Sequence, residues 1–182
     1  MVLSYVWTVE KRLVDKTERI KNLLRESMSY KELSHEEKVS RILAVLPQQK
    51  PFRYVDNLTH LDDNKIVGDY TFRQDEWFYQ GHFPGNPITP GVILLECMAQ
   101  IGLAAMAIHL FFNSDRNPED RITLFQSANI DFLSPIRPGD KVTVFGEKLL
   151  FKMGKIKCDV QMRLNDETVV ARGTLIGMGV KK

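Results

Sequence analysis

The spacing of hydrophobic residues changes once along the chain. In its first part, apolar residues recur every three or four positions within residues 10–28 and again within residues 35–46, which predicts two amphipathic helices. Residues 34–37 read Ser-His-Glu-Glu, the pattern of a capping box, so the second helix is expected to begin there and to end before Pro47. His35 would then lie in an exposed first turn, and we assign it no chemical role.

From Pro51 onward the apolar residues alternate with polar ones, which is typical of strands with one face on the core and one face in water. Strands of this kind form antiparallel sheets. The first two, separated by a turn at residues 62–64, predict a hairpin. The expected strands are residues 51–61, 65–72, 122–133, 141–151, 155–164 and 167–180.

One stretch between these strands has a different character and reads QGHFPGNPITPGVILLECMAQIGLAAMAIHL, from Gln80 to Leu110. Its prolines fix the backbone around His82, so this loop should be stiff. Thr89 and Pro90 then predict the start of a helix, with Thr89 as the N-cap and Pro90 in the first helical position. The predicted helix is apolar from Gly91 to Phe112. Its strongly polar side chains are those of Glu96, Gln100 and His109.

These patterns predict the α+β class, with an antiparallel sheet of about five to seven strands wrapped around one long apolar helix. Residues 47–182 would form this domain, and residues 1–46 would be a helical extension. The extension could cap the domain, contact a partner or lengthen a subunit interface.

Composition excludes some classes of function. The chain has 182 residues, a charged content of 26% and a net charge of +2, which is too small to indicate nucleic-acid binding. The apolar helix is long enough to cross a bilayer, but its polar side chains favour burial within the protein. We expect a cytoplasmic protein without a secretion signal, in which Cys97 and Cys158 are reduced and buried. His109, near the helix end, is expected to be a C-terminal cap or a surface residue.

The loop and helix together, GHFPGNPITPGVILLE, resemble the hotdog-fold β-hydroxyacyl-acyl carrier protein dehydratases of fatty acid synthesis. The resemblance extends over Leu46 to Met178 and includes the stretches LPQQKPFRYVD and SPIRPGD. It implies a hotdog fold and a homodimer with active sites shared between subunits, with a higher oligomer such as a trimer of dimers as a further option. It also implies acyl carrier protein as partner and no cofactor or metal, because the phosphopantetheine arm arrives with the substrate.

The same resemblance implies roles for three residues. The catalytic histidine of the family corresponds to His82, and its catalytic carboxylate corresponds to Glu96. A glutamate at that position is similar to the dehydratases that do not isomerise the double bond. The helix-start glycine, whose amide binds the substrate carbonyl, corresponds to Gly91.

The chemistry of dehydration suits these residue types. A proton must leave Cα, and another must reach the departing hydroxyl. Imidazole side chains change charge close to neutral pH, so histidine is a suitable base. Desolvation on an apolar helix favours a protonated Glu96, which can act as the acid. Free N–H groups at a helix start, such as that of Gly91, suit the negative charge that develops on the thioester oxygen. Gln100, one turn after Glu96, would orient it or bind a water.

Two further sets of residues are candidates for substrate and partner contacts. Aromatic side chains near the loop and on a later strand could wall an acyl tunnel, or could simply fill the core. The candidates are Trp77, Phe78, Phe83 and Phe125. Basic residues could attract an acidic carrier domain, or could be solvated strand faces. These are Arg137, Lys152, Lys155 and Lys157.

Other functions on the same fold remain open. A thioesterase needs a carboxylate placed for attack by water and does not need the His82 loop, whereas an isomerising dehydratase would carry aspartate in place of Glu96. A non-catalytic hotdog partner in a polyketide or pigment pathway would be free to lose either His82 or Glu96. Both residues are present, which favours an enzyme.

Overall fold

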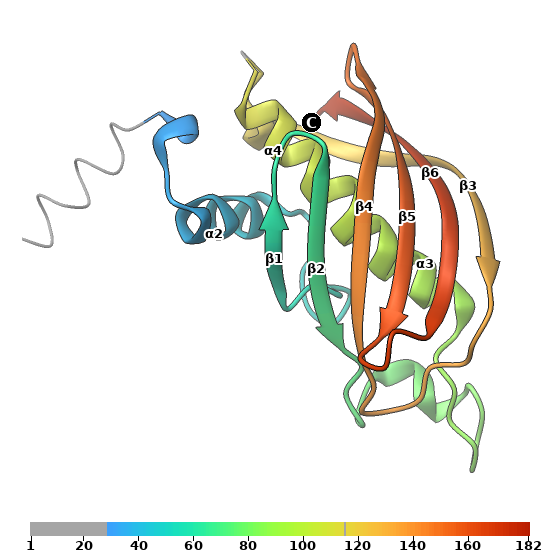
Figure 1. Cartoon of the computed structure of the whole chain (residues 1–182). Coiled ribbons are helices and arrows are strands. Elements are labelled where there is room, and N and C mark those ends of the chain that lie inside the picture. Colours follow the sequence, from blue (N-terminus) through green and yellow to red (C-terminus); the bar gives the residue numbers. More distant parts are fainter. Residues whose placement is uncertain (1–28, 115) are drawn as a thin grey trace, which may run out of the picture. The chain divides into compact units, whose positions relative to one another are not determined.

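The computed structural model describes residues 29–114 and 116–182 (Figure 1). The chain divides after Lys38 into two units. The helix expected over residues 10–28 lies outside the described residues. Helix α2 (His35–Val45) follows the predicted capping box. The Ser34 Oγ accepts a hydrogen bond from the Glu37 amide at 3.3 Å, and the Glu37 carboxylate accepts one from the Ser34 amide at 3.0 Å.

The second unit contains a six-stranded antiparallel sheet with the strand order β1-β2-β4-β5-β6-β3. On the strand Lys155–Leu164 the predicted alternation matches the burial, because Ile156, Cys158, Val160 and Met162 are buried. The strands are β1 (Asn57–Leu61), β2 (Lys65–Thr71), β3 (Arg121–Phe132), β4 (Lys141–Lys152), β5 (Lys155–Leu164) and β6 (Val169–Lys181).

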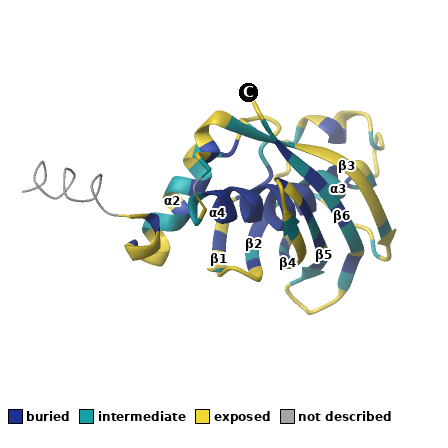
Figure 2. Ribbon diagram, turned by 90° about the horizontal axis from the view of Figure 1, so that it is seen from above, coloured by how far each residue is buried: buried dark blue, intermediate teal, exposed yellow. Residues whose placement is uncertain are grey.

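A continuous helix of 22 residues, Gly91–Phe112, lies against the concave face of this sheet and forms the core (Figures 1 and 2). It consists of α3 (Gly91–Ala99), a π-helical stretch (Gln100–Ala105) and α4 (Met106–Phe112). Its length and composition would suit a membrane span, but 78% of its most apolar window is buried inside the protein. The helix is therefore the core of a hotdog fold, and the expected burial is confirmed.

Glycines let the helix approach the sheet closely. A Cβ added to Gly146 on β4 would lie 2.8 Å from the Cα of Gly102, and one added to Gly102 would lie 2.7 Å from a methyl group of Val160 on β5. Both distances are too short for real Cβ contacts. The middle of the helix can therefore rest on the centre of the sheet only because both positions lack a side chain.

Two local predictions outside the start of the long helix are wrong. The first strand begins at Asn57 and not at Pro51, because the preceding backbone bonds to a side chain of the helix: the Tyr54 amide donates to the Gln100 Oε1 at 2.7 Å. His109 is not a surface residue. It is 3% exposed, and its Nε2 lies 3.2 Å from a carboxylate oxygen of Asp63 in the β1–β2 turn.

Strand β3 forms one end of the sheet, pairing with β6 along one edge. It is the most exposed of the long strands, as the largely yellow ribbon in Figure 2 shows. Several large apolar side chains on it and just after it are about half exposed. They are Leu124, Phe125, Phe132 and Leu133. A long apolar edge strand of this kind is suited to pairing with another chain.

Candidate active site

The loop between β2 and α3 holds His82 in one orientation. The His82 amide donates to the Phe78 carbonyl at 3.0 Å, and the His82 carbonyl accepts from the Ile88 amide at 3.0 Å. The ring Nδ1 lies 2.9 Å from the Ile88 carbonyl oxygen. Because a carbonyl can only accept, Nδ1 carries the hydrogen and the neutral ring has its lone pair on Nε2. The loop thus presents Nε2 as the basic nitrogen.

Helix α3 begins one residue later than the sequence predicted. Pro90 is the N-cap, and the Thr89 hydroxyl does not cap the helix because it is hydrogen bonded to the Tyr79 hydroxyl at 2.6 Å in the protein interior. The Ile93 and Leu94 amides bond to the Pro90 carbonyl. The amides of Gly91 and the residue after it therefore precede the first helical hydrogen bonds, which leaves them available to an oxygen of a ligand.

A groove of about 310 Å³ runs past this helix start. Gly91 and Leu94 line one side of it, and Phe132 and Leu133 at the end of β3 line the other. A Cβ on Gly91 would lie 3.5 Å from the Phe132 ring, in ordinary contact. The absence of a side chain at Gly91 therefore widens the groove beside the free amide.

Glu96 lies on α3, roughly 7.5 Å further along the helix axis than Gly91. Its Oε1 accepts two hydrogen bonds, from the Gln100 Nε2 at 2.8 Å and from the Gln48 Nε2 at 3.4 Å. Burial raises the pKa of the Glu96 carboxyl, and the two amide donors lower it by a smaller amount. The net rise favours the protonated acid compared with an exposed glutamate.

Gln100 connects this carboxyl to the segment that crosses over the helix. The side chain is fully buried, and its Nε2 donates both to Glu96 and to the Phe52 carbonyl at 2.8 Å. Its Oε1 accepts from the Tyr54 amide. All the polar atoms of the buried amide are thus used to hold the backbone of residues 52–54 and the carboxyl of Glu96 together.

Sequence reasoning missed Gln48. It lies in the LPQQKPF stretch before the sheet, and neither its residue type nor its spacing points to the helix. The only available signal was that this stretch belongs to the recognised family pattern. Its contact with Glu96 follows from the path of the chain across the helix.

The chain carries the parts of the site in two separate halves. His82 is anchored to its own loop, and Glu96 is anchored to Gln48 and Gln100. Among the residues that the structure describes, no hydrogen bond joins His82 to Glu96. Each half is nevertheless held in place without the other.

The four aromatic candidates do not form one wall within the chain. Phe78 is buried in the core and stacks edge-on with Trp77 at 5.6 Å between ring centres, whereas Phe83 is half exposed and lies flat against the His82 ring at 4.0 Å. Phe125 is half exposed on β3. Within the described part of the chain, no ring contact joins Phe125 to the other three.

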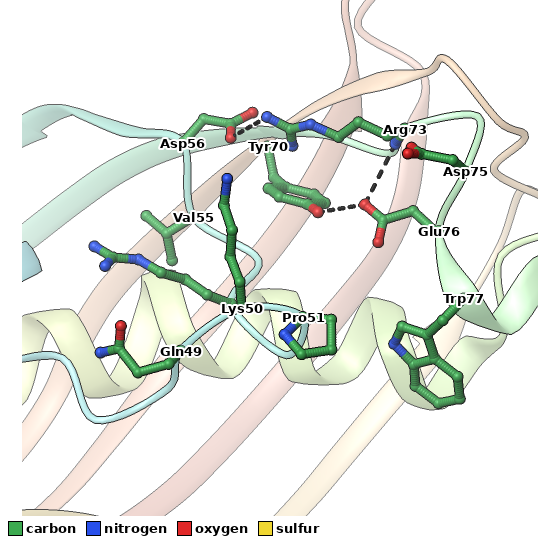
Figure 3. Close-up of a pocket in the computed structure, with 11 residues that line it drawn as sticks. Gln49, Lys50, Pro51, Val55, Asp56, Tyr70, Arg73, Asp75, Glu76 and Trp77 are labelled. Carbon is green, nitrogen blue, oxygen red and sulfur yellow. Dashed lines mark hydrogen bonds and ion pairs between the residues drawn. The ribbon is translucent and has the colours of Figure 1, made fainter.

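Trp77 also lines a cleft of about 830 Å³ between residues 49–56 and residues 70–77 (Figure 3). An ion pair between Arg73 and Asp56 at 2.5 Å and a hydrogen bond from the Tyr70 hydroxyl to Glu76 form its upper wall. None of the predicted catalytic residues lines this cleft, so it is separate from the candidate site.

The basic candidates separate into two places. Arg137 donates to the Asn86 side chain at 3.1 Å, on the loop that carries His82. Lys152 and Lys155 flank the β4–β5 turn, near Phe151, whose ring contacts Phe111 at the far end of the long helix. That end is roughly 30 Å from Gly91 along the helix axis. Only Arg137 is thus close to the histidine loop.

The profile of the FabA-like domain matches residues 46–173, which is most of the chain. This protein belongs to the FabA-like family. It is 37% identical over 108 residues to the 3-hydroxyacyl-[acyl-carrier-protein] dehydratase FabZ of Geobacter metallireducens, covering 58% of this chain and 69% of that relative. The FabZ of Herpetosiphon aurantiacus is 35% identical over 144 residues, covering 76% of this chain and 94% of the relative.

Solved structures share the fold of this FabA-like domain at low identity. A thioesterase mutant from Pseudomonas aeruginosa superposes with a TM-score of 0.58 at 12% identity, covering 79% of this chain and 94% of that one. A virulence protein from Campylobacter jejuni gives 0.58 at 15% identity, covering 83% and 96%. At such identities these structures support the hotdog architecture and carry no information on activity.

Proposed function

We propose that this protein removes water from a β-hydroxyacyl group carried on acyl carrier protein, producing the trans-2-enoyl thioester in fatty acid biosynthesis. The observation that carries the proposal is that one chain holds both a His82 with its Nε2 lone pair free, fixed by the hydrogen bond of Nδ1 to Ile88, and a Glu96 carboxyl whose pKa burial raises. The FabZ relatives are named for this reaction.

Each residue has a defined part in the reaction. His82 Nε2 takes the proton from Cα, and the electron pair of that C–H bond is first shared with the thioester oxygen and then becomes the second bond between Cα and Cβ. The Cβ–O bond breaks as Glu96 gives its proton to the departing hydroxyl, which leaves as water. General acid and base groups of this kind contribute typically about 10²–10⁴-fold each.

The start of α3 stabilises the negative charge that forms on the thioester oxygen. The free amide of Gly91 donates to that oxygen, and the positive end of the helix dipole adds to the stabilisation. A single donor of this type is commonly worth about 3 kcal/mol of barrier. The groove between Gly91 and Phe132 admits the thioester beside this amide.

A complete site needs two chains in this proposal. The exposed edge of β3 pairs with the β3 of a second copy, and the surface of α3 around Val92, which is 71% exposed, packs in the same interface. His82 of one chain then faces Glu96 of the other. Pairing two identical edges produces a symmetric dimer, the commonest form of assembly.

The acyl carrier protein is the partner and the cytoplasm the location that fit this reaction. Arg137, next to the histidine loop, is the basic residue best placed to receive an acidic carrier domain beside the site. Lys152, Lys155 and Lys157 are at the other end of the long helix, so they would contribute through the overall field of the protein.

The test is an assay of the purified protein with β-hydroxyacyl-carrier substrates of several chain lengths, in which mass spectrometry follows loss of water from the acyl group. Wild-type protein should form the enoyl thioester, and His82→Ala and Glu96→Gln should each lose most activity. Release of free carrier thiol instead of water, undiminished in His82→Ala, would show that the protein is a thioesterase.

A further inference from the structure

Gln48 has an unsatisfied acceptor next to the proposed acid. Among the described residues, Gln48 Oε1 is one of three buried side-chain oxygens with no hydrogen-bond partner. The same amide donates from Nε2 to Glu96 Oε1 at 3.4 Å. Because buried polar atoms are nearly always paired, an unpaired acceptor at a reaction site indicates a missing donor.

The side-chain amides of Gln48 and Gln100 make the two carboxyl oxygens of Glu96 different from each other. Gln48 and Gln100 both donate to Oε1, which therefore acts as the carbonyl-type oxygen when the carboxyl is protonated. The proton is then carried by Oε2, the oxygen to which no amide donates. The acid that donates to the substrate thus has a fixed orientation.

The substrate hydroxyl needs an acceptor as well as a donor. When Glu96 gives a proton to the hydroxyl oxygen, the hydrogen already on that oxygen must point to some acceptor, since an unpaired O–H in a buried site costs free energy. Gln100 cannot supply one, because its Oε1 is occupied by the Tyr54 amide. Gln48 Oε1 is a buried acceptor beside Glu96, and no group within the described part of the chain bonds to it.

We infer that Gln48 recognises the β-hydroxyl of the substrate: its Oε1 accepts the hydroxyl hydrogen while Glu96 protonates the hydroxyl oxygen. This inference rests on the proposed dehydratase function. The departing water carries two hydrogens, the original one held by Gln48 and the one from Glu96, while the Cα proton goes to His82. Gln48 is thus a specificity residue for 3-hydroxyacyl groups over acyl groups that lack the hydroxyl.

The experiment compares Gln48→Met with wild-type protein and with the control Gln49→Met. Methionine keeps the length of the side chain and removes both amide groups, whereas Gln49 is an exposed neighbour. For Gln48→Met, kcat/KM on the 3-hydroxyacyl-carrier substrate should fall by about 5- to 150-fold. The Kd of a saturated acyl-carrier analogue without the hydroxyl should stay within about twofold of wild type, because that ligand makes no bond to Gln48.

A second readout separates this role from general support of the fold. Gln48→Met removes one hydrogen-bond donor to Glu96, so the pKa of Glu96 rises. The pH above which kcat falls, because the acid is deprotonated there, should therefore move to a higher value. Gln48→Asn, which keeps an amide but retracts it by one methylene, should show the same selective loss and serves if the methionine variant does not fold.

The outcomes are distinct. An unchanged kcat/KM in Gln48→Met, or an equal weakening of the analogue without the hydroxyl, would overturn the inference and leave the proposed function standing. A wild-type protein that forms no enoyl product would refute the proposed function, and the inference with it.

Discussion

Replacing Gln100 with leucine tests whether this side chain holds the crossing segment onto the helix. The change leaves the Tyr54 amide and the Phe52 carbonyl without their partner, since both bond to the buried Gln100 amide. An unsatisfied buried group costs about 1–3 kcal/mol, so the two together should lower the free energy of unfolding by roughly 2–6 kcal/mol. For a unit of this size the melting temperature should fall by roughly 5–20 °C.

Urea unfolding followed by tryptophan fluorescence measures the loss, with circular dichroism giving the melting temperature. The control is Gln49→Leu, the same change at an exposed glutamine whose side chain donates to the Leu46 carbonyl at 3.2 Å, and it should stay within about 1 kcal/mol of wild type. A Gln100→Leu protein as stable as its control would show that the Gln100 hydrogen bonds do not hold residues 52–54, and the account of the Glu96 environment would fail with them.

Three further predictions concern the base, the acid and the helix–sheet contact. His82→Ala should reduce kcat by roughly 10²–10⁴-fold without changing the melting temperature by more than a few degrees; an unchanged kcat would remove His82 from the mechanism. Because burial raises the pKa of Glu96, ionisation of this group opposes folding, so Glu96→Gln should be more stable than wild type at pH 8 and equal to it below about pH 4.5. A difference in melting temperature that does not depend on pH would contradict this. Gly146→Ala should cost about 1–3 kcal/mol in urea unfolding because its Cβ overlaps Gly102, and a variant of wild-type stability would mean that the helix has room to move.

The fold could be predicted from the sequence because hydrophobic residues recur with a clear spacing in its strands and helices. The alternation on β5 and β6 predicts strands with one buried face, and the apolar run interrupted by Glu96, Gln100 and His109 predicts a helix buried within the protein. The spacing of hydrophobic residues along the chain does not reveal hydrogen bonds between residues that are distant in sequence. The segment before Asn57 alternates like a strand, yet Gln100 holds its backbone against the helix, and nothing in the local sequence indicates this.

The sequence names His82, Gly91 and Glu96 as candidate site residues because the family pattern is dense there, and their roles stay predictions. The sequence did not indicate Gln48, because its contact with Glu96 depends on where a distant segment crosses the helix. It also misplaced the hydroxyl of Thr89, a good N-cap by residue type, which bonds instead to Tyr79. In both cases the tertiary fold decides which partner a polar side chain bonds to.

The claim that two chains form each site is tested most directly by mixing two inactive variants. His82→Ala and Glu96→Gln are unfolded together in equal amounts and refolded, so that about half of the dimers contain one chain of each kind. If His82 of one chain works with Glu96 of the other, each mixed dimer regains one intact site, and dehydratase activity should return to about a quarter of that of refolded wild type. If the mixture stays as inactive as its two parents while mass spectrometry detects mixed dimers, the shared site is contradicted.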